Sequence, residues 1–309
     1  MYPSAKRAGR RALGIPLVAR TALGLAAVRG RGAALVYHRI TDGSAPPGGI
    51  VPAISQHTFR SQLDDLLRIS DVVPLTSLIE SRRFARRPRV ALTFDDDSIT
   101  HHDVVLPVLR DLGLTATFFV GGRSLHGLGP PWFEILDALV LARGIHDVAR
   151  WLGTPDGNAA ALAESCERDV NLQRKLEEES VEAPEQLGRR HLRALVDAGM
   201  TIGFHTLHHR LLTNLRDDEI EAALADGKEE LEAVLEEPIR SFAYPHGKTD
   251  ARVVARARRA GYLTAWTGRP GPIVRGGDRY RLGRFEPGEL LGSDLVARLA
   301  VILNGWVAS

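Results

Sequence analysis

Short apolar segments recur along the chain, and most are followed by a stretch with apolar residues at helical spacing. The predicted strands are 33–37, 71–75, 89–94, 115–120, 200–204, 239–243 and 262–266. The predicted helices are 55–67, 104–112, 192–198, 220–235 and 250–260. Strands that alternate with such helices need crossover connections and therefore a parallel sheet. We expect an α/β fold whose parallel sheet is closed into a barrel, with its functional residues at the strand ends.

The alternation is interrupted between residues 121 and 188. Trp132, Phe133, Leu136 and Leu139 stand at helical spacing, and an acid-rich helix is expected around 168–179. We interpret this stretch as a helical insertion, at about 122–186, that covers one face of the barrel. Its pattern favours a role in packing over a role in the chemistry.

Composition excludes several classes of protein and of metal site. The 309 residues are 44% hydrophobic and 25% charged, which excludes a disordered chain, collagen and a coiled coil. The single cysteine, Cys166, excludes an intramolecular disulfide and a cysteine-rich zinc site. Any metal must therefore be held by histidine, aspartate or glutamate.

Charge is distributed unevenly between an N-terminal arm, 1–31, and the remaining domain, 32–309. The net charge is 40 − 38 = +2, but the arm has seven basic residues and no acid, so the remainder carries 2 − 7 = −5. We expect no nucleic-acid partner. The apolar stretch 12–28 contains Pro16 and Arg20, and fits neither a transmembrane helix nor a secretory signal well.

Two interpretations of the arm remain open. It is either a helix that caps the domain or an anchor of basic and apolar residues on a membrane surface. The expected location is accordingly cytoplasmic or membrane-associated.

Polar residues collect at three predicted strand ends. Asp95, Asp96 and Asp97 follow one strand, and three adjacent carboxylates need a cation or basic group among them unless they form a solvated loop or a helix cap. His205 and His209 follow another strand, four residues apart. Two imidazoles and one carboxylate would form a three-ligand site that leaves positions open for water and substrate.

The same three ligands also occur in iron oxygenases, but those need an all-β pattern that this chain lacks. The third strand end carries Pro245, His246 and Gly247. A turn fixed by the proline and the glycine can present backbone N–H groups to an oxyanion.

Three ordered motifs resemble those of the polysaccharide deacetylases with NodB homology, carbohydrate esterase family 4. They are TFDD at 93–96, HTxxH at 205–209 and FAYPxG at 242–247. The resemblance covers about 35–285, with a core of about 88–285. It implies a distorted (β/α) barrel and a hydrolase that uses a divalent metal to remove acetyl groups from a glycan. Zinc is the first choice of metal, with cobalt, nickel or manganese as alternatives.

The resemblance also implies roles for individual residues. Asp95 would be the general base that assists a metal-bound water, and Asp96, His205 and His209 would hold the metal. The backbone N–H of His246 would stabilise the oxyanion, and Tyr244, Pro245 and Trp266 are expected to contact the substrate. The substrate would be an N-acetylated sugar polymer or a lipid-linked glycan precursor.

The general acid needs a separate argument, because the late Leu-x-His motif of the family is missing here. A branch similar to the biofilm poly-N-acetylglucosamine deacetylases has instead an N-terminal Y-H-x-I strand. Residues 37–40 match it, so His38 is the candidate acid, unless it only hydrogen-bonds to a loop.

Two departures from the family pattern leave activity open. Asp97 replaces a glycine, and could add a ligand, crowd the substrate or turn outward. Ala243 replaces an arginine that pairs with the base, and Arg240 or Arg284 could take its place. The alternative function is therefore a degenerate family member that binds glycan without hydrolysing it.

Overall fold

The computed structural model describes residues 17–43, 48–79, 85–155, 157–179, 181–182 and 184–306. The first sixteen residues of the arm therefore lie outside the described residues. The strands are β1 (Gly32–Tyr37), β2 (Arg39–Thr41), β3 (Ala53–Ser55), β4 (Asp71–Val72), β5 (Arg89–Asp95), β6 (Thr117–Val120), β7 (Thr201–Phe204), β8 (Ser241–Ala243), β9 (Thr264–Thr267) and β10 (Leu282–Phe285).

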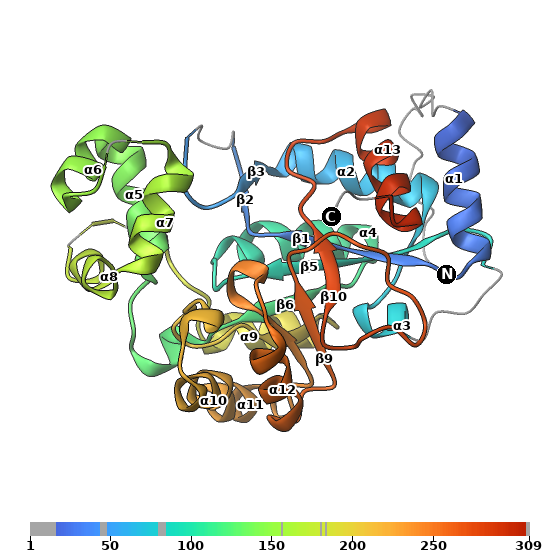
Figure 1. The fold of residues 1–309 in the computed structure, drawn as a ribbon. Helices are drawn as coiled ribbons and strands as arrows, with labels where there is room; N and C mark the ends of the chain where they lie inside the picture. Colours follow the sequence, from blue (N-terminus) through green and yellow to red (C-terminus); the bar gives the residue numbers. More distant parts are fainter. Residues whose placement is uncertain are drawn as a thin grey trace.

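The α-helices occupy most of the intervals between the strands and both ends of the described chain (Figure 1). They are α1 (Leu17–Val28), α2 (Gln56–Ile69), α3 (Leu75–Ile79), α4 (Leu106–Leu112), α5 (Trp132–Arg143), α6 (Ile145–Leu152), α7 (Ala159–Arg168), α8 (Val170–Glu177), α9 (Arg189–Asp197), α10 (Asp217–Ala225), α11 (Lys228–Leu235), α12 (Ala251–Arg259) and α13 (Gly292–Asn304).

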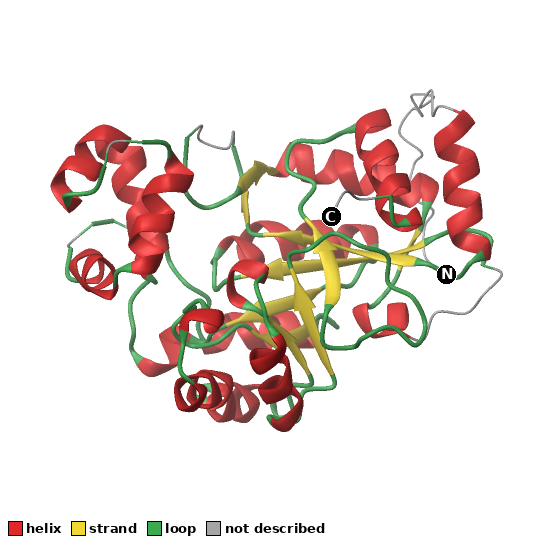
Figure 2. Cartoon of the chain, in the orientation of Figure 1, coloured by secondary structure: helices red, strands yellow, loops and turns green. Residues whose placement is uncertain are grey.

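Seven parallel strands close into a barrel in the order β1, β10, β9, β8, β7, β6, β5, and β5 pairs back to β1. The closing pair runs in register from Gly32 opposite Arg89 to Tyr37 opposite Phe94. Figure 2 shows the strands at the centre with helices around them. The expected α/β class and barrel are confirmed. In such a barrel the functional side chains gather at the carboxyl ends of the strands.

Local signals in the sequence set the helix ends. Ser55 Oγ accepts a hydrogen bond from the Thr58 backbone N–H at 3.0 Å and so caps α2, and Asp250 caps α12 through Val253 N–H at 2.9 Å. Gly113 ends α4 with φ of 65°, a left-handed conformation that favours glycine. These residues therefore fix where α2 and α12 begin and where α4 ends.

Several elements differ from the sequence-based expectation, and β2, β3 and α13 are among those without a predicted counterpart. The helix predicted over 220–235 is broken into α10 and α11, because Gly227 has φ of 83° between them. The strand predicted over 71–75 ends at Val72, and α3 begins at Leu75. Strand β10 has no counterpart among the predicted strands, since its four residues include a glycine and an arginine and no β-branched side chain.

Helices α5 to α8 lie between β6 and α9 and have an apolar core of their own, which includes Trp132, Leu136, Leu162 and Cys166. They stand together at one end of the molecule in Figure 1. Arg39 of β2 attaches this unit to the barrel. Its buried guanidinium donates to Glu134 and, at 2.5 Å, to Asp137, both on α5.

Helix α1 packs against α13 at the opposite end of the molecule (Figure 1). Arg31 donates to the Leu303 carbonyl at 3.2 Å, and Asn304 donates to the Ala22 carbonyl at 3.0 Å. No helix within the described ranges has both the length and the hydropathy needed to cross a bilayer. The two ends of the described chain therefore form one helical layer on the barrel.

Candidate active site

The three proposed metal ligands meet at the carboxyl ends of β5 and β7. His205 Nε2 and His209 Nε2 lie 3.8 and 3.7 Å from Asp96 Oδ1. Taking one ligand atom from each residue, all three atoms lie within 4.8 Å of one another. They line a cavity of about 370 Å³ that also includes Asp95, His38 and His246. The sequence motifs therefore converge on one site.

His205 is oriented by its second ring nitrogen. Its Nδ1 donates a hydrogen bond to the Ala243 carbonyl at 2.9 Å, and a carbonyl can only accept. The proton is thus on Nδ1, and Nε2 presents a lone pair toward Asp96. This is the tautomer that binds a metal through Nε2.

These residues fit a divalent cation. Burial lowers the pKa of His205 to about 4 and lowers that of His209 well below its usual value, so both imidazoles are neutral donors. Burial, with the neighbouring carboxylates Asp95, Glu134 and Asp97, raises the pKa of Asp96 to about 7, although the charge of His38 opposes it. Neutral imidazoles with an ionisable carboxylate are suitable ligands for zinc and related ions.

Backbone conformation at the site is unusual. Asp96, Thr206, His209 and His246 have φ of 74°, 66°, 49° and 57°, a left-handed region that residues other than glycine rarely adopt. Among the described non-glycine residues only Glu236 shares it. Such strain persists where the surrounding structure imposes it and is typical of functional sites.

Asp95 faces an arginine from a different strand. Arg284 of β10 makes two hydrogen bonds to it, Nη1 to Oδ1 at 2.6 Å and Nη2 to Oδ2 at 2.7 Å. Burial alone would raise the pKa of Asp95, but the charge and hydrogen bonds of Arg284 lower it to about 2. Arg284, and not the exposed Arg240, therefore stands in for the arginine missing at Ala243.

Asp97 turns away from the ligand cluster. Its Oδ1 accepts from Gly121 N–H at 2.9 Å, and its Oδ2 accepts from Gly122 and Arg123 N–H at 3.0 and 3.2 Å. The carboxylate is buried and caps the loop that follows β6. Of the three possibilities for Asp97, the structure favours the one in which its side chain turns away from the ligands. It does not support a further ligand or a residue that crowds the substrate.

His38 is at the end of β1 and lines the same cavity. Its Nδ1 lies 3.1 Å from Glu286 Oε1, and its carbonyl accepts from His101 Nε2 at 2.7 Å. Burial lowers the pKa of His38, but Glu286, with the charges of Asp96 and Asp95, raises it to about 9. His38 is therefore protonated at neutral pH.

His246 lies in a short turn (η4, Pro245–Gly247) beside the cluster. Its ring packs against that of His209, with centroids 4.6 Å apart. Its Nε2 is 2.8 Å from Glu167 Oε2, on α7 of the insertion. The role of its backbone N–H toward an oxyanion stays a prediction.

The residues expected to contact substrate do not line the cavity. Tyr244 is fully buried in the layer outside the barrel, where its hydroxyl donates to the Tyr280 carbonyl at 2.9 Å, and Pro245 is also buried. Trp266 is fully buried inside the barrel with Ala34, Ala91 and Phe119. The expectation is corrected because side chains of one strand alternate between faces, and motif position alone does not say which face meets the cavity.

The cavity wall comes instead from segments whose part in the site the sequence pattern did not reveal. Ile50, Val51 and Pro52 precede β3, and Trp132, Phe133 and Ala163 belong to the insertion. Neither Glu286 nor Glu167 carried a local signal. Glu286 follows β10, a strand that the sequence pattern does not predict, and Glu167 belongs to a helix distant in sequence.

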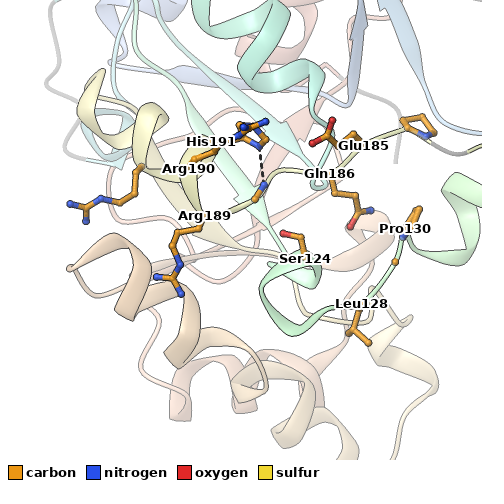
Figure 3. Close-up of a pocket in the computed structure, with 12 residues that line it drawn as sticks. Ser124, Leu128, Pro130, Glu185, Gln186, Arg189, Arg190 and His191 are labelled. Carbon is orange, nitrogen blue, oxygen red and sulfur yellow. Dashed lines mark hydrogen bonds between the residues drawn. The ribbon is translucent and has the colours of Figure 1, made fainter.

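A second hollow, of about 900 Å³, lies outside this site. Figure 3 shows Arg189, Arg190 and His191 at the start of α9 on one side of it and Ser124 and Leu128 on the other. None of the grouped metal ligands identified in the described part of the chain lines it. The smaller cavity is therefore the candidate active site.

The family model for polysaccharide deacetylase matches residues 83–265, more than half of the chain. The chain belongs to the polysaccharide deacetylase family, whose members are hydrolases of carbon–nitrogen bonds in acetylated sugars. No curated protein matches its sequence.

Three solved structures with this fold illustrate the likeness. The Streptococcus pyogenes deacetylase PplD, in complex with acetate, has 18% identity and a TM-score of 0.60 over 88% of this chain and 98% of its own. IcaB from Ammonifex degensii has 21% identity and a TM-score of 0.59 over 90% and 99%. A polysaccharide deacetylase from Bacillus cereus has 18% identity and a TM-score of 0.60 over 87% and 69%. At these identities the likeness supports the fold.

Proposed function

We propose that this protein is a metal-dependent deacetylase of an N-acetylated sugar polymer or a lipid-linked glycan precursor. One observation carries the proposal: Asp96, His205 and His209 share a cavity with an ionised Asp95 and a protonated His38. A divalent cation, zinc first and cobalt, nickel or manganese as alternatives, would supply a Lewis acid that polarises the acetyl carbonyl and acidifies water.

The protein's own groups supply proton transfer and orientation. Asp95 is held by Arg284 and stays ionised, so it is available as the general base beside the ligand cluster. His38 is protonated through its contact with Glu286 and would donate its proton to the departing amine. The His246 backbone N–H would stabilise the oxyanion.

Acetate release tests the proposal directly. N-acetylglucosamine oligomers incubated with zinc- or cobalt-loaded protein should release acetate, and a chelator should stop the release. Asp96→Ala should lose metal and activity together, whereas Asp95→Asn should keep metal and lose activity. A wild-type protein that binds metal and oligomer but releases no acetate would instead establish the non-hydrolysing alternative.

We also propose that α1 lies on a membrane surface. Its inner face packs on α13, yet the outer face is apolar as well: Leu17 and Val18 are 79% and 76% exposed, and Leu25 and Val28 share that face. Arg20 and Arg29 flank it, and the first 31 residues contain no acid. Apolar contact with basic flanks favours anionic lipid. Sedimentation with phosphatidylglycerol vesicles, but not with phosphatidylcholine vesicles, is expected.

A further inference from the structure

The two histidines of the cluster are held in different ways. His205 is fixed by the hydrogen bond from its Nδ1 to the Ala243 carbonyl, 2.9 Å long. The Nδ1 of His209 is buried and has no hydrogen-bond partner among the residues that the structure describes. Metal-ligating histidines are almost always oriented through their second nitrogen. The ring of His209 must therefore be fixed by other contacts.

Two aromatic neighbours supply part of this restraint. The ring of His209 packs against Phe133 of α5, with centroids 4.7 Å apart, and against His246, with centroids 4.6 Å apart. Phe133 is in the apolar core of the insertion, so its position is set by packing. His246 is in a turn with a left-handed backbone, and its side chain is 25% exposed.

Glu167, near the end of α7, contacts the His246 side chain. Its Oε2 lies 2.8 Å from His246 Nε2, at ion-pair distance but without the alignment of a hydrogen bond. Its Oε1 accepts a hydrogen bond from the Leu211 backbone N–H at 3.0 Å, two residues after His209. One carboxylate therefore restrains both the ring beside His209 and the backbone that follows it.

Burial separates this contact from ordinary surface ion pairs. The side chain of Glu167 is 11% exposed, whereas Glu164 and Arg168, which pair on the same helix, are 60% and 71% exposed. Exposed ion pairs contribute little to stability, but a largely buried carboxylate with two partners restricts the positions of both partners.

We propose that Glu167 is a positioning residue of the metal site: through His246 and the Leu211 backbone it sets the orientation of His209 toward Asp96. The inference rests on the proposed function, because it requires a cation at Asp96, His205 and His209. It also gives the helical insertion a part in the chemistry, where the sequence pattern favoured packing alone.

Metal affinity tests this role without reference to turnover. Metal-free wild type, Glu167→Ala and Glu167→Gln would be titrated with zinc and with cobalt against a competing chelator. Glu167→Ala loses both contacts and should bind on the order of 10- to 100-fold more weakly. Glu167→Gln keeps an acceptor for Leu211 N–H but loses the charge, so a smaller loss is expected. The visible spectrum of bound cobalt should change in Glu167→Ala, because it reports ligand geometry.

Glu164→Ala is the matched control on the same helix, and should bind both metals as wild type does. Thermal unfolding of the metal-free proteins distinguishes a loss of fold stability from a loss of metal affinity at the site. Unchanged affinity and cobalt spectrum in both Glu167 variants would overturn the inference, even if their metal-free Tm were lower. If Glu167→Ala does not fold, Glu167→Gln decides by the same criteria. Failure of wild type to bind either metal would overturn the proposed function first, and this inference with it.

Discussion

Asp95 and Asp96 are adjacent in the chain, but their pKa values are shifted in opposite directions. Burial raises the pKa of both side chains, but the Arg284 guanidinium reverses the effect at Asp95 and lowers its pKa to about 2. Asp96 has no such partner, and its pKa is raised to about 7. Different surroundings thus suit the two adjacent carboxylates to different roles: Asp95 remains ionised, and Asp96 is placed to bind a cation.

Replacing Arg284 should destabilise the fold in a pH-dependent way. Arg284→Met leaves Asp95 buried without a partner, and such a loss costs about 3–5 kcal/mol. The folded-state pKa of Asp95 is below its ordinary 3.8, so the ion pair stabilises the protein above pH 3.8 and this contribution is lost as pH falls toward 2. Urea unfolding of both proteins at pH 7, 4 and 3 should show a stability gap that narrows in acid.

Arg240→Met is the control for that measurement, because Arg240 is exposed and should be replaced at little cost. A difference in the free energy of unfolding between wild type and Arg284→Met that stays constant from pH 7 to 3 would contradict the ion pair of Arg284 with Asp95.

His38→Ala should lower the rate of acetate release on the order of 10²-fold, with metal content unchanged. A general acid must be protonated, and the pKa of His38 is raised to about 9, so activity should decline above that pH. Glu286→Gln removes the charge that raises this pKa and should move the decline to lower pH. Initial rates from pH 6 to 10 measure both effects; full activity of His38→Ala would remove its catalytic role.

At the scale of elements, Asp97 holds the loop after β6 and not the metal. Asp97→Ala leaves the N–H groups of Gly121, Gly122 and Arg123 without their carboxylate, and we expect a loss of stability of about 2 kcal/mol or more. Asp97→Asn retains one oxygen and should lose less. Chemical unfolding and zinc titration check this together: a large change in zinc affinity with unchanged stability would make Asp97 part of the ligand site.

Sequence patterns predicted the strands whose motifs carry chemistry, because a short apolar run followed by polar residues is a local signal. Strand β10 lacks that signal: Arg284 is tolerated in the barrel only because Asp95 pairs with it, and that partner is distant in sequence. The inward or outward direction of Tyr244 and Trp266 depends on pleat and barrel closure, which motif spacing does not contain. Glu167 likewise approaches His246 only through tertiary packing.

At the scale of the whole molecule, α1 has two apolar faces with separate roles. Ala22 is buried against the α13 layer, so Ala22→Asp should lower Tm by burying an unpaired charge. Leu17 faces outward, so Leu17→Asp should leave Tm unchanged and weaken sedimentation with phosphatidylglycerol vesicles. Thermal unfolding and vesicle sedimentation of both variants separate the faces. Equal vesicle binding by Leu17→Asp and wild type would exclude the outer face as the lipid contact.

Closure of the barrel has a consequence for how the protein is made. β1 lies between β5 and β10, so one edge of the first barrel strand is completed only by residues 282–285. On a translating ribosome, that edge remains open until residues 282–285 have emerged, and Arg284 reaches Asp95 only then. A nascent chain halted before residue 282 should consequently expose an unpaired strand edge, which makes it a substrate for chaperones until β10 is made.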